Sequence, residues 1–167
     1  MRTIVRAAST GMLAALCLSL SAVPADPVAP ATPAVSLVAA SPAQQVLTLV
    51  NAERAKAGCQ PVRLDSRLNA AATKHSQDMA KNNFFSHTGR DGSTFVTRIR
   101  REGYPAPRSE NIAAGNTTAQ ATMRQWMNSA GHRRNILDCT AKDMGVGVAS
   151  SPSSTYRTYW TQDFGRG

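Results

Sequence analysis

The stretch "MGVGVASSPSSTYRTYWTQDF", residues 144–164, decides the fold class of this chain. It holds two runs, "MGVGVAS" and "TYRTYWTQDF", that are rich in Val, Tyr, Trp and Thr and are separated by the turn-forming "SPSS". Branched and aromatic residues favour strands, whereas Ser and Pro favour turns, so the pattern predicts a β-hairpin. In the second run, alternate residues are expected to share one face: Tyr156, Thr158, Trp160, Gln162 and Phe164.

The first segment before the hairpin that has helical periodicity begins at Ser41. Ser41 and Pro42 suit the N-cap and the first helical position, and Gln44 completes a capping box. The helix is expected to end at Gly58, which can supply the left-handed C-cap residue. We therefore place the folded domain at residues 41–167.

A second helix is predicted to begin at Asp65 or Ser66. Its buried stripe recurs at helical spacing: Leu68, Ala71, Ala72, His75 and Met79. A histidine on such a stripe is more often a hydrogen-bonded core residue than a ligand, so His75 is assigned to the core.

The middle of the chain predicts two more helices and one short strand. The first helix spans about residues 94 to 102, and the apolar piece 110 to 115 forms the strand. Thr117 with Gln120 makes another capping box, and Gly131 is expected to stop the helix that follows. Three side chains of that helix are assigned to packing rather than to an exposed ligand groove: Met123, Trp126 and Met127. Helices combined with a terminal hairpin argue for an α+β domain.

The N-terminus has the layout of a secretory signal peptide. Arg2 and Arg6 precede the apolar run "GMLAALCLSLSAV", residues 11–23, which is shorter than the roughly 20 residues of a membrane-spanning helix. Small or permissive residues follow, and cleavage is predicted after Ala25, so residues 1–25 form the signal peptide. The chain is therefore expected to be secreted, with no transmembrane segment in its mature form.

The segment after the predicted cleavage site, residues 26–40, is rich in Pro and Ala and predicts an extended linker. Cys17 is expected to leave with the signal peptide, because the bulky Leu16 before it does not suit a lipoprotein anchor. Removal leaves Cys59 and Cys139, which in an oxidising compartment are expected to form a disulfide. The alternative is two buried free thiols.

The charge balance is basic. The formal net charge of the whole chain is +9, and loss of Arg2 and Arg6 leaves +7. Such a domain attracts anionic wall polymers or acidic lipids in a salt-dependent way, with no specific nucleic-acid recognition implied. The arginines that could carry this adhesion, or else form ordinary solvated faces, are Arg98, Arg100, Arg101, Arg133 and Arg134.

Seven phrases occur in an informative order: "NAERAKAGC", "HSQDM", "FFSHTGRDG", "SENIAAG", "WMNSAGHRRNIL", "MGVGVA" and "YWTQDFG". This order closely resembles bacterial members of the CAP superfamily, the SCP-like extracellular proteins related to cysteine-rich secretory proteins, insect venom allergens and plant pathogenesis-related proteins. The resemblance covers about Gln45 to Gly165. It implies an α-β-α sandwich in which a central antiparallel sheet lies between helices.

The resemblance also implies a surface cleft lined by two histidines and two glutamates. His87, Glu110 and His132 match three of these positions. The second glutamate does not carry over, because the Trp-x-x-Glu of many eukaryotic relatives ends here in Ser129.

Two imidazoles and one carboxylate are a ligand set for zinc or another divalent metal, with positions left for water or substrate. Ser86 and Asn111 are expected to orient their neighbours His87 and Glu110. Simpler roles stay open for each: Ser86 and Asn111 as turn caps, Glu110 as the ion partner of an arginine, and His132 as a cation at the end of a helix.

Three functions are compatible with these residues. The leading hypothesis is a secreted, monomeric CAP domain that binds a small ligand, lipid or divalent metal at the His87, Glu110 and His132 cleft. The second is a metal-dependent hydrolase that uses the same cleft. The third is a basic module that adheres to anionic cell-wall polymers.

Overall fold

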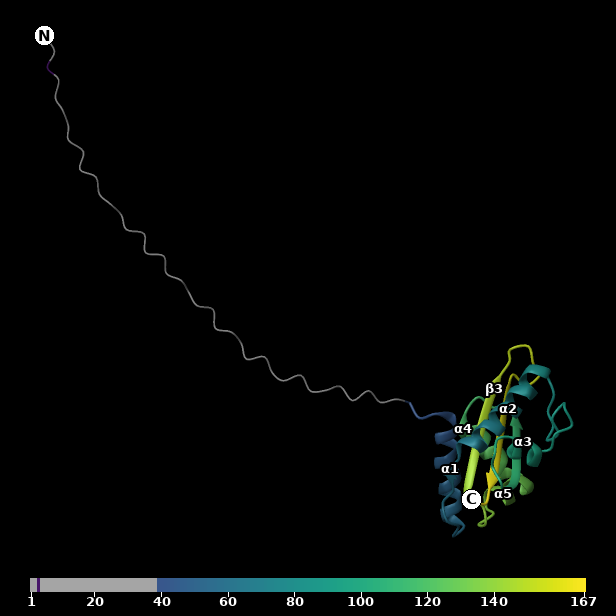
Figure 1. Cartoon of the computed structure of the whole chain (residues 1–167). Coiled ribbons are helices and arrows are strands. Elements are labelled where there is room, and N and C mark those ends of the chain that lie inside the picture. Colours follow the sequence, from purple (N-terminus) through teal and green to yellow (C-terminus); the bar gives the residue numbers. More distant parts are fainter. Residues whose placement is uncertain (1–2, 4–38) are drawn as a thin grey trace. The chain divides into compact units, whose positions relative to one another are not determined.

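The folded part of the chain is an α+β domain, shown in Figure 1. The structure is a computed structural model that describes Thr3 and residues 39–167. Apart from Thr3, the predicted signal peptide lies outside the described residues, as does almost all of the predicted linker, so both remain predictions. Among the described residues, no helix is long and apolar enough to cross a membrane.

The described part of the chain contains five helices and four strands. In chain order they are α1 (Pro42–Lys56), β1 (Arg63–Leu64), α2 (Ser66–Asn82), α3 (Phe95–Arg101), β2 (Pro107–Ala114), α4 (Ala119–Asn128), α5 (Ala130–Ile136), β3 (Asp143–Ser150) and β4 (Thr158–Gly165).

The four strands form one sheet in the order β1-β3-β4-β2. The predicted hairpin is confirmed, because β3 and β4 pair antiparallel over eight residues, and β2 pairs antiparallel with the other side of β4. The short β1 pairs parallel with β3, so the sheet is mixed rather than purely antiparallel. β2 is consequently an edge strand.

Helices cover both faces of the sheet. On one face, α1, α4 and α5 share a core with alternate strand residues such as Ala113, Val146 and Trp160. On the other face, α2 and α3 pack over the opposite set, which includes Ile112 and Tyr159. The α-β-α layering expected from the family resemblance is confirmed.

Most helix starts agree with the sequence. Ser41, Asp65 and Thr94 are the N-caps of α1, α2 and α3, and each side chain accepts hydrogen bonds from the first turn. The cap of α4 was wrong by one residue: it is Thr118, whose hydroxyl accepts from the backbone N–H of Ala121. Both threonines can cap a helix, but only Thr117 has a glutamine three residues later, so the capping-box pattern selected the wrong one and the backbone path decides.

The predicted stop at Gly131 was wrong. The chain leaves the helix at Ser129, which has an extended backbone, and α5 begins at the next residue. Gly131 and His132 are therefore both inside the first turn of α5. The strand in the last run is also shorter than predicted: Arg157, with φ of 62°, still belongs to the turn, so Tyr156 lies outside β4.

Two ties hold the α1–β1 loop against the α5–β3 loop. The predicted disulfide between Cys59 and Cys139 is confirmed, with Cα atoms 4.9 Å apart. Beside it, the fully buried Arg54 donates four hydrogen bonds of 2.8 to 3.1 Å to backbone carbonyl oxygens, those of Gln60, Ile136, Asp138 and Ala141.

Candidate functional site

The candidate site is built on the edge strand β2. Successive side chains of a strand point to opposite faces, so Glu110 lies on the α2 and α3 face while Asn111 lies on the α5 face. His87 comes from the loop after α2, and His132 comes from α5. The two histidines thus come from opposite sides of the sheet, one from the loop after α2 and the other from α5.

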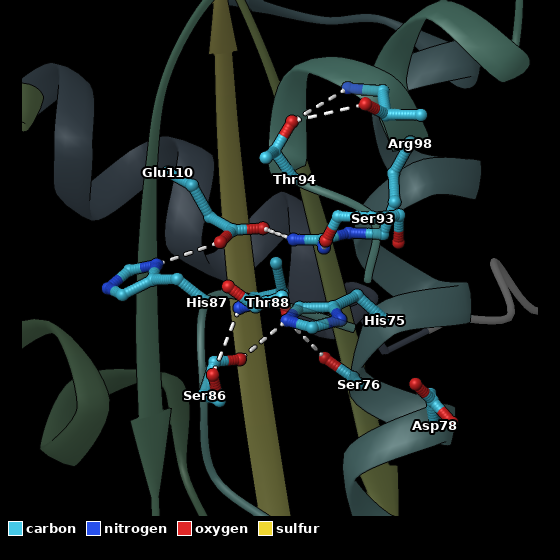
Figure 2. A network of polar contacts seen from close by, with 12 residues as sticks. His75, Ser76, Asp78, Ser86, His87, Thr88, Ser93, Thr94, Arg98 and Glu110 are labelled. Atoms are coloured by element: carbon cyan, nitrogen blue, oxygen red, sulfur yellow. Dashed lines mark hydrogen bonds and ion pairs between the residues drawn. The ribbon is translucent and has the colours of Figure 1, made fainter. Parts of the chain in front are cut away.

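Glu110 is the centre of an ion-pair cluster (Figure 2). Its side chain is 1% exposed; one carboxylate oxygen lies 2.8 Å from Nδ1 of His87, and the other accepts from Nη2 of Arg98 at 2.5 Å. Arg98 also donates to the carbonyl oxygen of Ser93. The expectation of Arg98 on a solvated face was wrong, because its charge is buried against that of Glu110.

His87 faces solvent with one side of its ring. Its side chain is 55% exposed, although Nδ1 is hydrogen-bonded to the buried Glu110. A carboxylate oxygen accepts hydrogen bonds, so the network assigns a proton to Nδ1, and the neutral ring then keeps a lone pair on Nε2. Glu110 therefore orients the ring of a largely exposed histidine.

His132 is half-buried on the other side of β2. Burial, and secondly the nearby His87, lower the pKa of its imidazole. Its Nδ1 is buried without a hydrogen-bond partner. The alternative role as a cation at a helix C-terminus is wrong, because the first turn of α5 is the positive end of a helix and disfavours the charged ring.

The two predicted orienting residues make other contacts than expected. The hydroxyl of Ser86 accepts from the backbone N–H of Thr88, which is the turn-capping alternative, while its carbonyl oxygen meets Nε2 of His75. Asn111 donates to the carbonyl oxygen of His132 at 3.2 Å. Asn111 thus holds the backbone of the α5 histidine against β2.

His75 is confirmed as a hydrogen-bonded core residue. It is 1% exposed, and its Nε2 lies 2.9 Å from the carbonyl oxygen of Ser86. Burial is the main cause that lowers its pKa, so the ring is neutral at physiological pH.

The motif around His132 also completes the free edge of β2. Nε1 of Trp126 donates to the carbonyl oxygen of Ile112, and Nδ2 of Asn135 donates to that of Glu110. Unpaired edge carbonyls of a sheet attract other strands, so these side chains protect the edge beside the site.

The assignment of Trp126 and Met123 to packing is confirmed, since both are buried in the larger core. Met127 is partly buried and packs against the same core, and together with Met123 it also lines a groove of about 400 Å³ between α1 and α4.

Asp163 is a site residue that sequence analysis missed. It is fully buried on β4, directly opposite Glu110, and neither of its carboxyl oxygens has a hydrogen-bond partner. Burial first, and then the charge of Glu110, raise the pKa of Asp163 well above the ordinary value, against the opposing effect of Arg98. The alternation of the strand could not reveal it, because β4 is covered on both faces.

Replacement of Asp163 by Asn is expected to give a stability gain that grows with pH. Because the pKa is raised in the folded state, the unfolded chain releases this proton first once the pH exceeds about 4, so the wild type loses stability from there up to the raised pKa. Asn does not titrate and avoids that loss. Urea unfolding of both proteins between pH 3.5 and 8 measures the difference. A deficit of the Asn variant that appears only at neutral pH would instead indicate an ionised Asp163 paired with Arg98.

The family follows from the motifs, the layered fold and this cluster: the chain belongs to the CAP family. The model of the cysteine-rich secretory protein family matches residues 47–164. The chain is 37% identical over 122 residues to the uncharacterized protein YkwD of Bacillus subtilis strain 168, covering 72% of this chain and 46% of YkwD. It is 34% identical over 123 residues to the uncharacterized membrane protein YlbC of the same organism, covering 72% and 33%.

A solved structure agrees with this assignment. An extracellular protein of Bacillus anthracis strain Ames that contains an SCP domain superposes with a TM-score of 0.67 at 32% identity, over 75% of this chain and 40% of that protein. The chain thus spans less than half the length of these three relatives.

Proposed function

We propose that this protein is a secreted CAP-domain protein that binds a divalent metal ion of the zinc type between His87 and His132. The observation that carries the proposal is that two histidines are held at neighbouring residues of β2: His87 is hydrogen-bonded to Glu110, and the backbone carbonyl oxygen of His132 accepts from Asn111. The N-terminal pattern of the sequence supports secretion, as does the extracellular relative from Bacillus anthracis.

The donor set fits such an ion in part. Metal-bound histidines are neutral and commonly donate their second ring N–H to a carboxylate, which is the relation between His87 and Glu110. Both oxygens of Glu110 already accept hydrogen bonds, so we assign it to orientation rather than to ligation. Among the described residues, no group of three or more His, Cys, Asp or Glu side chains is arranged to hold a metal. Two imidazoles would hold the ion, which would offer its open positions to a ligand.

The proposal predicts loss of zinc binding when either histidine is removed. In calorimetric titrations of the purified protein with zinc chloride near pH 7.5, His87→Ala and His132→Ala should each lower the affinity at least about 100-fold, since loss of an orienting partner alone costs 10- to 100-fold. Arg133→Ala is the matched control, because this exposed neighbour of His132 offers no metal ligand. Wild type that binds no zinc, or histidine variants that bind as the wild type does, would refute the proposal.

The contacts of the described residues favour neither alternative function. A hydrolase needs a group that is free to move a proton beside the metal, and Glu110 is held by both His87 and Arg98. Adhesion through a cluster of arginines loses Arg98, which is buried. The contacts therefore support metal-dependent hydrolysis and the binding of anionic wall polymers less well than they support metal binding.

A further inference from the structure

An exposed pair of aromatic rings lies at the end of the sheet where β3 turns into β4 (Figure 1). Among the residues that the structure describes, two large apolar side chains are exposed, Phe85 at 43% and Tyr156 at 48%. Their ring centroids are 5.8 Å apart, although Phe85 follows α2 and Tyr156 belongs to the β3–β4 turn. Exposed apolar side chains are ordinary when they are scattered singly, whereas a pair in contact indicates an interaction surface.

The aromatic pair is held in place by the residues around it. The Tyr156 ring meets the buried ring of Tyr159 edge-on, with centroids 6.0 Å apart. Oδ1 of Asn83, the residue that ends α2, accepts a 2.7 Å hydrogen bond from the backbone N–H of Thr155. This bond ties the β3–β4 turn to the segment that carries Phe85. Rings that are already fixed lose little conformational entropy when a ligand binds.

A groove adjoins the same turn. It has a volume of about 420 Å³, within the range for small-molecule sites, and lies between the second half of α2 and the end of β3. Both elements supply hydrogen-bonding side chains to it: Gln77, Lys81, Ser150 and Ser151. Ser151 begins the turn that carries Tyr156, and Lys81 lies two residues before Asn83. The groove and the aromatic pair therefore share the end of α2 and the β3–β4 turn.

Positive charge on this surface has no acidic partner. Lys81 and Arg157 are exposed, and neither forms an ion pair with a described residue. Residues 79–90 and 149–158 contain no Asp or Glu. The carboxylate of Asp78, just before the first of these segments, already accepts hydrogen bonds within the chain. The surface therefore attracts a negatively charged group.

The chemistry of a matching ligand follows from these groups. The ligand must present C–H groups to two aromatic rings, hydroxyl groups to the polar side chains of the groove, and an anionic group to the two cations. An acidic sugar combines all three. The face of an aromatic ring carries partial negative charge and attracts the C–H groups of a sugar, while a sugar carboxylate forms charge-assisted hydrogen bonds with Lys and Arg.

A lipid surface fits the same residues less well. The turn between β3 and β4 is rich in hydroxyl groups, which are carried by Ser151, Ser153 and Thr155 among others. Insertion of the two rings into a bilayer would carry these polar groups with them, and polar groups that lose water without a partner cost free energy. A hydrated glycan leaves them in water or hydrogen-bonds to them.

We propose that the surface formed by Phe85, Tyr156 and the adjoining groove binds an acidic oligosaccharide. Sugar rings pack on the two aromatic rings, and the sugar carboxylates are held by Lys81 and Arg157. The surface contains none of the arginines considered above for adhesion, and the proposal does not depend on metal binding by the cleft.

The test is a calorimetric titration of the purified protein with oligogalacturonate, at low ionic strength and in the presence of a chelator. Wild type should bind oligogalacturonate more tightly than a neutral maltooligosaccharide, and more tightly than polyglutamate of equal charge. Tyr156→Ser removes one exposed ring and should weaken binding at least about fivefold. Tyr156→Phe keeps the ring and should stay within about twofold of the wild type. Phe85→Ser repeats the test on the other ring.

The contribution of charge is tested separately. Lys81→Gln combined with Arg157→Asn should also weaken binding at least about fivefold, since two attractions to the carboxylates are lost. Asn suits position 157 because it tolerates the φ of 62° found there. Arg124→Gln combined with Arg134→Gln is the matched control: it removes two exposed cations from α4 and α5, in the opposite helical layer, and should leave binding unchanged.

Three results would overturn the proposal. Wild type that does not bind oligogalacturonate would do so, even if it bound vesicles of phosphatidylcholine and phosphatidylglycerol, which would identify a lipid surface instead. Equal affinity for polyglutamate would mean that charge alone accounts for binding. Wild-type affinity in the Ser variants of both rings would show that the aromatic pair takes no part. Because chelator is present throughout, failure of zinc binding leaves these results unaffected.

Discussion

Replacing Gly147 with alanine is expected to destabilise the domain by about 3 kcal/mol or more, the upper end of the cost of overpacking. Gly147 lies on β3 directly beneath α2, where an added Cβ would overlap the backbone nitrogen of Thr73. The clash is with helix backbone rather than with the end of a flexible side chain, so a small rotation cannot relieve it. Thermal unfolding should show a fall in Tm of at least about 10 °C.

Gly131→Ala is the matched control for this substitution. Gly131 lies inside α5, where an added Cβ would make only an ordinary contact with the Arg134 side chain at 3.8 Å, and alanine there should be neutral or stabilise by up to about 1 kcal/mol. Equal Tm values for Gly147→Ala and wild type would show that α2 does not need this close approach. Such a result would contradict the packing on which the position of His75 depends.

The close approach at Gly147 illustrates which parts of the fold the sequence could predict. Capping residues and periodicity act within a few residues along the chain, so the starts of α1, α2 and α3 were predicted correctly. The parallel pairing of β1 joins residues 63 and 143, and no local pattern contains that information. No local pattern contains the arrangement of the three layers either, so only the family resemblance could predict it.

In the candidate site, too, local motifs could be predicted and long-range contacts could not. His87, Glu110 and His132 could be selected from motifs, and the structure brings His87 into contact with Glu110. The sequence could not identify the two residues that lie beside the Glu110 carboxylate, Arg98 and Asp163. Arg98 was one of several arginines with no distinguishing neighbour, and the position of Asp163 opposite Glu110 follows only from the register of β2 against β4.

The second large expected effect concerns the two ties between the α1–β1 and α5–β3 loops. Cys59→Ser combined with Cys139→Ser should lower the free energy of unfolding by about 4 to 5 kcal/mol, because the bridge closes a loop of 80 residues that the unfolded chain otherwise opens. Arg54→Met should cost about 3 to 5 kcal/mol, since it leaves four carbonyl oxygens without their donor. Urea unfolding at pH 7 measures both.

The two costs are expected to add to less than their sum when the three substitutions are combined. With the disulfide intact, the loops stay together and the carbonyl oxygens freed by Arg54→Met remain buried. Without the disulfide, the loops can separate and water can reach those oxygens, so the loss of Arg54 lowers the free energy of unfolding by a smaller amount. An Arg54→Met variant that loses less than about 1 kcal/mol would contradict this account, and would mean that the burial that lowers the pKa of Arg54 offsets what its hydrogen bonds contribute. Strict additivity in the combined variant would mean that the two ties hold separate parts of the fold.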